Sequence, residues 1–174
     1  METRHIGGLA VSVVGIGCNN FGGRIDQAAT TAVVDTALDA GINFFDTADI
    51  YGGTRSEEML GHALGPRRDE VVIATKWGMG DGTKLPAGAS AASIATAIEG
   101  SLKRLGTDRI DLYQLHAPDD ATPHDETLER SISSCVRARC ARSAVRTSTA
   151  VASTTPRRRP RSSERRGTSA CRTS

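Results

Sequence analysis

Short apolar runs alternate with amphipathic segments along the first 129 residues of the chain. The apolar runs are rich in β-branched and aromatic residues, as in buried strands, and cover residues 11–17, 42–48, 70–78 and 109–116. Between them, apolar residues recur at helical spacing over residues 28–40, 57–64 and 93–106. This alternation predicts a parallel sheet whose successive strands are connected by helices.

The ends of the predicted helices carry capping signals. Asp26 and Ser56 are residue types that accept hydrogen bonds from the first N–H groups of a helix. Gly41 is of the residue type most often found just after the last residue of a helix. The third helix has an apolar side made by Ile94, Ile98, Leu102 and Leu105. These signals place each helix between two strands.

Two architectures fit this order of elements: an open doubly wound sheet and a (β/α)₈ barrel. The loop "GIGCNNFGG" after the first strand lacks both G-x-G-x-x-G and G-x-x-x-x-G-K-[ST] spacing. This lack of a phosphate-binding loop favours the barrel. In either architecture the catalytic and ligand-binding residues lie at the carboxyl ends of the strands.

Polar residues stand at three successive strand ends. Asp46 ends the second strand and is followed by Tyr51, while Lys76 and His116 end the third and fourth strands. An ammonium group beside a phenol favours the phenolate and makes the phenol a better acid, and a carboxylate can hold the ammonium in place. An imidazole beside them can orient a carbonyl oxygen. The set suits protonation of a developing alkoxide, which a hydride donor would complete as carbonyl reduction.

Each of these four residues also has a purely structural interpretation. Asp46 could cap a turn, and Tyr51 could be a half-buried loop aromatic. Lys76 could be a solvated strand end, and His116 a core histidine. Their joint occurrence at successive strand ends is what favours a catalytic site.

Three stretches closely resemble the aldo-keto reductases: "GINFFDTADIYGGTRSEEMLGHAL", "VVIATKWG" and "SLKRLGTDRIDLYQLHAPD". The resemblance covers residues 4–129, about four βα units, and it implies the N-terminal half of a (β/α)₈ TIM barrel. It further implies hydride transfer between NADPH, or sometimes NADH, and a small aldehyde or ketone.

The resemblance also implies a role for individual residues. Tyr51 would be the proton donor, Lys76 and Asp46 would tune its acidity, and His116 would orient the carbonyl of the substrate. Asp46 would also contact the nicotinamide ribose. Phe21 and Gly22 would lie near the nicotinamide.

Residues 130–174 have a different composition. Residues 1–129 carry 10 Lys and Arg against 19 Asp and Glu, whereas residues 130–174 carry 12 Arg and one acid, Glu164. The second segment has no aromatic residue and few aliphatic ones, so we expect it to be largely disordered.

A one-nucleotide frameshift near residue 129 or 130 accounts for this change. With synonymous codons chosen freely, the shifted frame permits "LDQLVRAGKVREIGCSNFDG" over residues 130–150 and "VSVQNE" over residues 168–174. The first string contains the "SNF" of the family's fifth strand, and the second matches its sixth-strand motif. We therefore expect an out-of-frame segment and a truncated, inactive chain.

Other functions and locations receive less support from the sequence. The half-barrel could be a non-catalytic binding or regulatory module, and the basic tail could bind nucleic acid through phosphates. Cys135, Cys140 and Cys171 lack a nearby fourth ligand, so we expect no metal. No transmembrane run or signal peptide is found, so we expect no membrane partner and a cytoplasmic protein.

Overall fold

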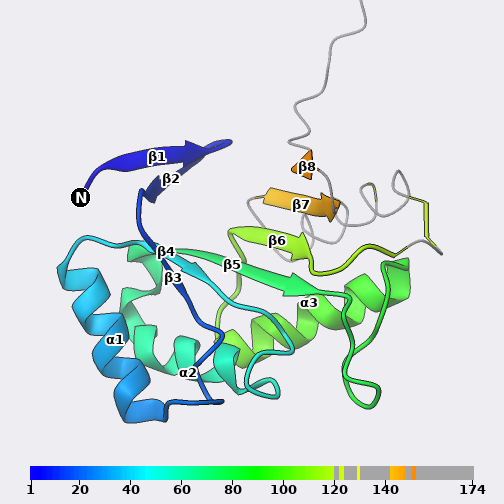
Figure 1. Ribbon diagram of the computed structural model, residues 1–174, viewed down its shortest axis with the longest axis horizontal. Helices are drawn as coiled ribbons and strands as arrows, with labels where there is room; N and C mark the ends of the chain where they lie inside the picture. The colour runs from blue at the N-terminus through cyan, green and yellow to red at the C-terminus, as the bar shows by residue number, and fades with distance from the viewer. Residues whose placement is uncertain (120–121, 124–128, 130–141, 148–149, 152–174) are drawn as a thin grey trace, which may run out of the picture.

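The computed structural model describes residues 1–119, 122–123, 129, 142–147 and 150–151 (Figure 1). The N-terminal strands β1 (Thr3–Ile6) and β2 (Leu9–Ser12) form an antiparallel hairpin. A separate six-stranded sheet follows in the order β3 (Gly15–Gly17), β4 (Phe44–Asp46), β5 (Val72–Trp77), β6 (Leu112–Leu115), β7 (Arg142–Thr147) and β8 (Ala150–Val151). Strands β3 to β7 are parallel, and β8 runs antiparallel to β7.

Helices connect the first parallel strands, as the sequence predicts. They are α1 (Gln27–Asp39), α2 (Arg55–Leu64), the short 3-10 helix η1 (Gly65–Glu70) and α3 (Ala91–Leu105). Figure 1 shows α1, α2 and α3 together on one side of the sheet. A doubly wound sheet carries helices on both faces, so this arrangement has the layers of a barrel wall.

The core lies between the sheet and this helical layer. Strands β4 and β5 and helices α1, α2 and α3 contribute fully or almost fully buried apolar side chains, among them Val34, Phe45, Leu60, Leu64, Ile73, Ile94 and Ile98. Full burial of one such aliphatic or aromatic side chain is worth about 1.5–3 kcal/mol. The amphipathic pattern read from the sequence therefore holds the helices on the sheet.

The capping predictions have mixed outcomes. Asp26 caps α1 and accepts a hydrogen bond from the Ala29 N–H at 2.9 Å. The prediction that Ser56 caps α2 is wrong, because the helix begins at Arg55, two residues before the predicted start at residue 57, and Thr54 stands before it with φ at +79°. The Ser56 hydroxyl instead donates to the Cys18 carbonyl at 2.8 Å, inside the protein.

The first apolar run is not the single strand that its sequence predicts. Residues 11–17 divide between β2, which belongs to the hairpin, and β3, which begins the main sheet. The Ser12 hydroxyl donates to the Val14 carbonyl at 2.6 Å where the chain turns between them. Because the apolar pattern continues through this turn, hydrophobicity alone could not locate it.

Two short strands lie in the Arg-rich segment, which we expected to be largely disordered. Strand β7 pairs in parallel with β6, and β8 pairs with β7. The remaining positions of residues 130–174 lie outside the described residues.

Candidate active site

Asp46 and Lys76 meet at the carboxyl ends of the neighbouring strands β4 and β5. The Lys76 Nζ donates to both carboxylate oxygens of Asp46 at 2.7 Å and to the Thr47 carbonyl at 2.9 Å. Lys76 is buried, while the Asp46 side chain is 37% exposed. The ammonium is therefore held in a fixed place, and the carboxylate still presents a free side.

A turn after β4 brings Tyr51 over this ion pair. The N–H groups of Thr47 and Asp49 donate to the Ala74 and Lys76 carbonyls at 2.9 and 3.0 Å, which continues the pairing with β5 beyond β4. The Tyr51 N–H then donates to the Ala48 carbonyl at 3.2 Å and closes the turn. As a result the Lys76 Nζ lies 5.1 Å from the centre of the Tyr51 ring.

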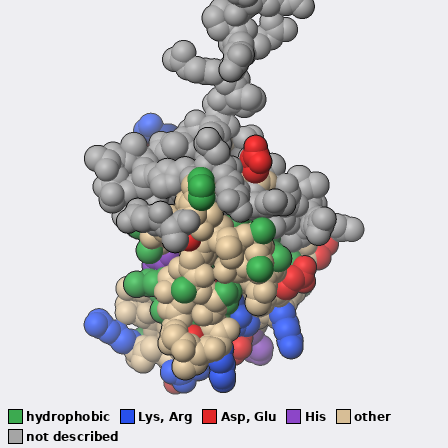
Figure 2. Space-filling view, turned by 90° about the vertical axis from the view of Figure 1, so that its right-hand side faces the viewer, with side chains coloured by type: hydrophobic (Ala, Val, Ile, Leu, Met, Phe, Trp, Pro, Cys, Tyr) green, Lys and Arg blue, Asp and Glu red, His purple; other side chains and the backbone are tan. Residues whose placement is uncertain are grey.

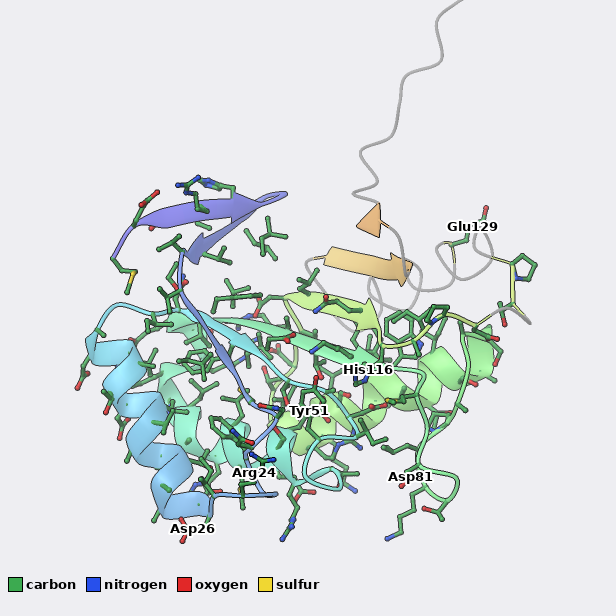
Figure 3. The ribbon with its side chains drawn as sticks, in the orientation of Figure 1. Arg24, Asp26, Tyr51, Asp81, His116 and Glu129 are labelled. Atoms are coloured by element: carbon green, nitrogen blue, oxygen red, sulfur yellow. The ribbon has the colours of Figure 1, made fainter. Side chains whose placement is uncertain are left out.

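His116 completes the group from the end of β6. Its backbone N–H donates to the Trp77 carbonyl at 2.8 Å, which fixes the residue against β5. The His116 and Tyr51 rings are 5.6 Å apart and nearly perpendicular, at 83° (Figure 3). The structure thus brings together all four residues that the strand ends predicted. Figure 2 faces the edge toward which β5 and β6 run, and hydrophobic, acidic and basic side chains are all exposed on it.

Phe21 and Gly22 lie in the loop after β3, against the Tyr51 turn. The Phe21 side chain is buried, and Gly22 has φ at +71°. A Cβ on Gly52, the residue after Tyr51, would collide with the Phe21 carbonyl oxygen and lie 3.1 Å from the Gly22 carbonyl carbon. The two loops are therefore packed backbone to backbone.

This close approach predicts a large difference between two neighbouring glycine substitutions. Gly52 and Gly53 have similar φ angles, +59° and +62°, but a Cβ on Gly53 would meet nothing within 4 Å. We expect Gly53→Ala to lower the free energy of unfolding by about 1–2 kcal/mol, because alanine is strained in the left-handed backbone conformation. Gly52→Ala should cost clearly more, because the Phe21 loop must also move.

Urea unfolding of both glycine variants measures this difference. Gly53→Ala serves as the control for backbone strain, so the excess loss in Gly52→Ala reports the contact between the loops. Equal losses of unfolding free energy in the two variants would contradict the packing described above.

The structure adds two residues to the site that the sequence reading missed. The Gln114 amide donates to Asp46 at 3.4 Å, and it stands two residues before His116 on β6. The two-residue period of a strand, which puts both on one face, could have identified it. Cys18 has a free, buried thiol, and its backbone N–H donates to the Asp46 carbonyl. Burial, and then the Asp46 charge, raise the pKa of this thiol, so it stays neutral.

A second buried ion pair lies behind the site. The Glu57 side chain is fully buried on α2, and the Arg104 Nε on α3 donates to it at 2.7 Å. The Thr75 hydroxyl, next to Lys76 on β5, donates to the same carboxylate at 2.6 Å. This network joins two helices to the strand that carries Lys76.

Two general features of the described residues bear on function. Within these residues no cluster of three or more His, Cys, Asp or Glu side chains is arranged to hold a metal ion. The helices of this part of the chain are all too short or too polar to cross a membrane.

Comparison with known proteins identifies the class to which this fold and site belong. A sequence model of the Aldo/keto reductase family matches residues 13–138. The chain therefore belongs to the aldo/keto reductase family, and its sheet and helices are part of that family's TIM barrel. The match ends at residue 138, past residue 129 where the sequence reading put the end of the family-like segment.

Several relatives are similar over the same part of the chain. The uncharacterized oxidoreductase YrpG of Bacillus subtilis is 43% identical over 143 residues, which cover 74% of this chain and 44% of the relative. A probable voltage-gated potassium channel subunit beta from rice is 40% identical, and the match covers 74% of this chain and 41% of the relative. Among solved structures, the holo form of the aldo-keto reductase AKR11C1 from Bacillus halodurans matches with a TM-score of 0.75 and 36% identity.

This chain spans only part of these relatives. The match covers 83% of this chain and 50% of the Bacillus halodurans enzyme, and it covers less than half of each of the two relatives above. The described residues form about half of the family's barrel.

Proposed function

We propose that this chain carries the catalytic half of a reductase that transfers hydride from NADPH to a small aldehyde or ketone. The observation that carries the proposal is the convergence of Asp46, Tyr51, Lys76 and His116 at one end of the sheet. Membership of the aldo/keto reductase family supports the same reaction.

Tyr51 is the general acid in this proposal. Its hydroxyl donates a proton to the carbonyl oxygen as negative charge develops there. The phenol oxygen becomes negative as the proton leaves, and the Lys76 ammonium at 5.1 Å from the ring stabilises that charge. Asp46 holds the ammonium in place through its 2.7 Å contacts. His116, edge-on to Tyr51, orients the carbonyl oxygen toward the phenol.

The residues present fit the nicotinamide end of the cofactor. The half-exposed Asp46 carboxylate has acceptor capacity left for a ribose hydroxyl, and Phe21 and Gly22 form an adjoining loop. When bound, NADPH supplies the hydride. By family resemblance, loops after the seventh and eighth strands hold the cofactor's phosphates, and NADH could replace NADPH.

We further propose that residues 130–174 are out of frame and that the chain as printed is inactive. The abrupt change from acidic to arginine-rich composition supports this, together with the two family motifs that a one-nucleotide shift permits. Among the described residues, β3 lies at the outer edge of the sheet and pairs only with β4. The protein is proposed to be cytoplasmic and to bind no specific nucleic acid.

The test compares the printed chain with one from a gene in which a nucleotide is restored near codon 130. We expect the restored frame to continue through "VSVQNE" and its product to consume NADPH with an aromatic aldehyde. The printed 174-residue chain should show no consumption above background. NADPH consumption by the printed chain that is lost on Tyr51→Phe would contradict the inactivity, and an inactive restored chain would contradict the reductase.

A groove at the open edge of the sheet favours a second candidate, a non-catalytic binding module. The groove has a volume of about 400 Å³ and is lined mainly by apolar side chains of α1 and β3, including Ile16, Val33 and Ala37. The rice relative is named as a probable channel subunit. Gel filtration of the printed chain separates the two candidates, because a defined oligomer supports the module and an aggregate contradicts it.

A further inference from the structure

Asp49 is a buried carboxyl group that the proposed reaction does not use. The residue is fully buried, and neither carboxylate oxygen has a hydrogen-bond partner of normal geometry among the described residues. A buried carboxylate without partners is strongly unfavourable, whereas the protonated acid costs much less. The position therefore favours a neutral side chain at the base of the Tyr51 turn.

The backbone of Asp49 connects the two central residues of the candidate site. Its N–H donates to the Lys76 carbonyl at 3.0 Å, the last backbone hydrogen bond between this segment and β5. Tyr51 follows two residues later and is held by the turn that begins at Ala48. Asp49 is thus the point at which the turn carrying Tyr51 is anchored to Lys76.

The charged groups around Asp49 come from three elements. Burial and then the Glu57 carboxylate on α2 raise the pKa of Asp49 to about 7, and Asp81 in the loop after β5 adds to this. The Arg104 charge on α3 and the Ile50 N–H oppose the rise and only partly offset it. Asp81 itself stays ionised, because the N–H groups of residues 83–85 lower its pKa to about 2.

We propose that Asp49 is a positioning residue that keeps the Tyr51 turn closed on Lys76 only while its carboxyl group carries a proton. Ionisation places a second negative charge beside that of the buried Glu57 carboxylate. Exposure of Asp49 to solvent relieves the repulsion between the two charges. That movement breaks the hydrogen bond from Asp49 to the Lys76 carbonyl and displaces Tyr51. The effect of this turn on catalysis rests on the proposed role of Tyr51, whereas the hydrogen bond that anchors the turn does not.

The direction of the pH effect follows from proton binding. The closed turn holds Asp49 with the higher pKa, near 7, and the open turn has the ordinary value near 4. The closed form therefore binds more protons between these values and loses stability as pH rises. Its population relative to the open form should fall nearly tenfold per pH unit between about pH 5 and pH 6, less steeply through pH 7, and stay constant above about pH 8.

Hydrogen exchange of the 174-residue chain, read by mass spectrometry between pH 5 and pH 8.5, tests this. After correction for intrinsic exchange rates, we expect protection of the peptide covering residues 47–53 to fall about 50-fold from pH 5 to pH 7. Asp49→Asn should make that protection independent of pH over the same range. A peptide from α3 serves as the internal control for global unfolding.

Two results would overturn the proposal. One is a pH dependence of residues 47–53 that is the same in Asp49→Asn as in the wild-type chain. The other, which needs no variant, is an Asp49 carboxyl carbon that titrates near pH 4 in the ¹³C NMR spectrum of the wild-type chain. Both measurements are independent of turnover, so an inactive enzyme and a pH-insensitive turn can be told apart.

Discussion

Replacement of Tyr51 by phenylalanine is expected to lower kcat/KM for carbonyl reduction roughly 100- to 10,000-fold in the frame-restored enzyme. The variant keeps the aromatic ring beside Lys76 and His116 but removes the proton that the reaction needs. The measurement is steady-state NADPH oxidation with an aromatic aldehyde at saturating cofactor. Because the ring remains, the loss should appear mainly in kcat.

Tyr113 provides a matched control for this substitution. It is the other tyrosine of the chain, fully buried on β6 and stacked on Trp77 at 4.3 Å between ring centres. Lys76 pairs with Gln114, the neighbour of Tyr113, so strand alternation puts Tyr113 on the other face of the sheet. Tyr113→Phe removes the same atom and should leave kcat/KM within a few-fold of wild type. Equal losses in Tyr51→Phe and Tyr113→Phe would mean that Tyr51 is not the proton donor.

Replacement of Arg104 by methionine is expected to lower the free energy of unfolding by about 3–5 kcal/mol. The substitution removes a 2.7 Å ion pair and leaves the fully buried Glu57 carboxylate with the Thr75 hydroxyl as its remaining side-chain partner among the described residues. An uncompensated buried charge costs far more than the ion pair contributes over a neutral replacement. Urea unfolding monitored by circular dichroism measures the change.

Two further variants separate the buried charge from general damage. Glu70→Gln breaks the exposed pair between Arg67 and Glu70, whose N–O distance is 3.2 Å, and should cost less than about 1 kcal/mol. Adding Glu57→Gln to Arg104→Met should recover part of the lost stability, since the buried charge is then gone. A double variant less stable than Arg104→Met alone would contradict this explanation.

The hydrophobic pattern predicted the main elements well, because burial on a sheet or under a helix imposes a simple period. The helices over 28–40 and 93–106 are found as α1 and α3, and the strand ends put Asp46, Lys76 and His116 on one rim. Parallel strands end at the same edge, so the order of elements already implied that these side chains could converge.

Several features could not be predicted because they depend on contacts between distant segments. At the break between β2 and β3, the Ser12 N–H donates to the Asn43 side chain, 31 positions away. At the start of α2, the Ser56 hydroxyl donates to the Cys18 carbonyl, 38 positions away. The pairing of Glu57 with Arg104 joins residues 47 positions apart. A sequence read in short windows contains no signal for such pairs.

The alternation of strands and helices, the family motifs, the four candidate catalytic residues and the change of composition near residue 130 can all be read from the order of amino acids. That the helices lie on one side of the sheet, and that the Phe21 loop packs on the Tyr51 turn, is seen only in the folded chain. It alone left Asp49 buried without a normal hydrogen-bond partner among the described residues. The physical reason is that periodicity records which side chains avoid water, whereas packing decides which of them meet and which polar groups lose their partners.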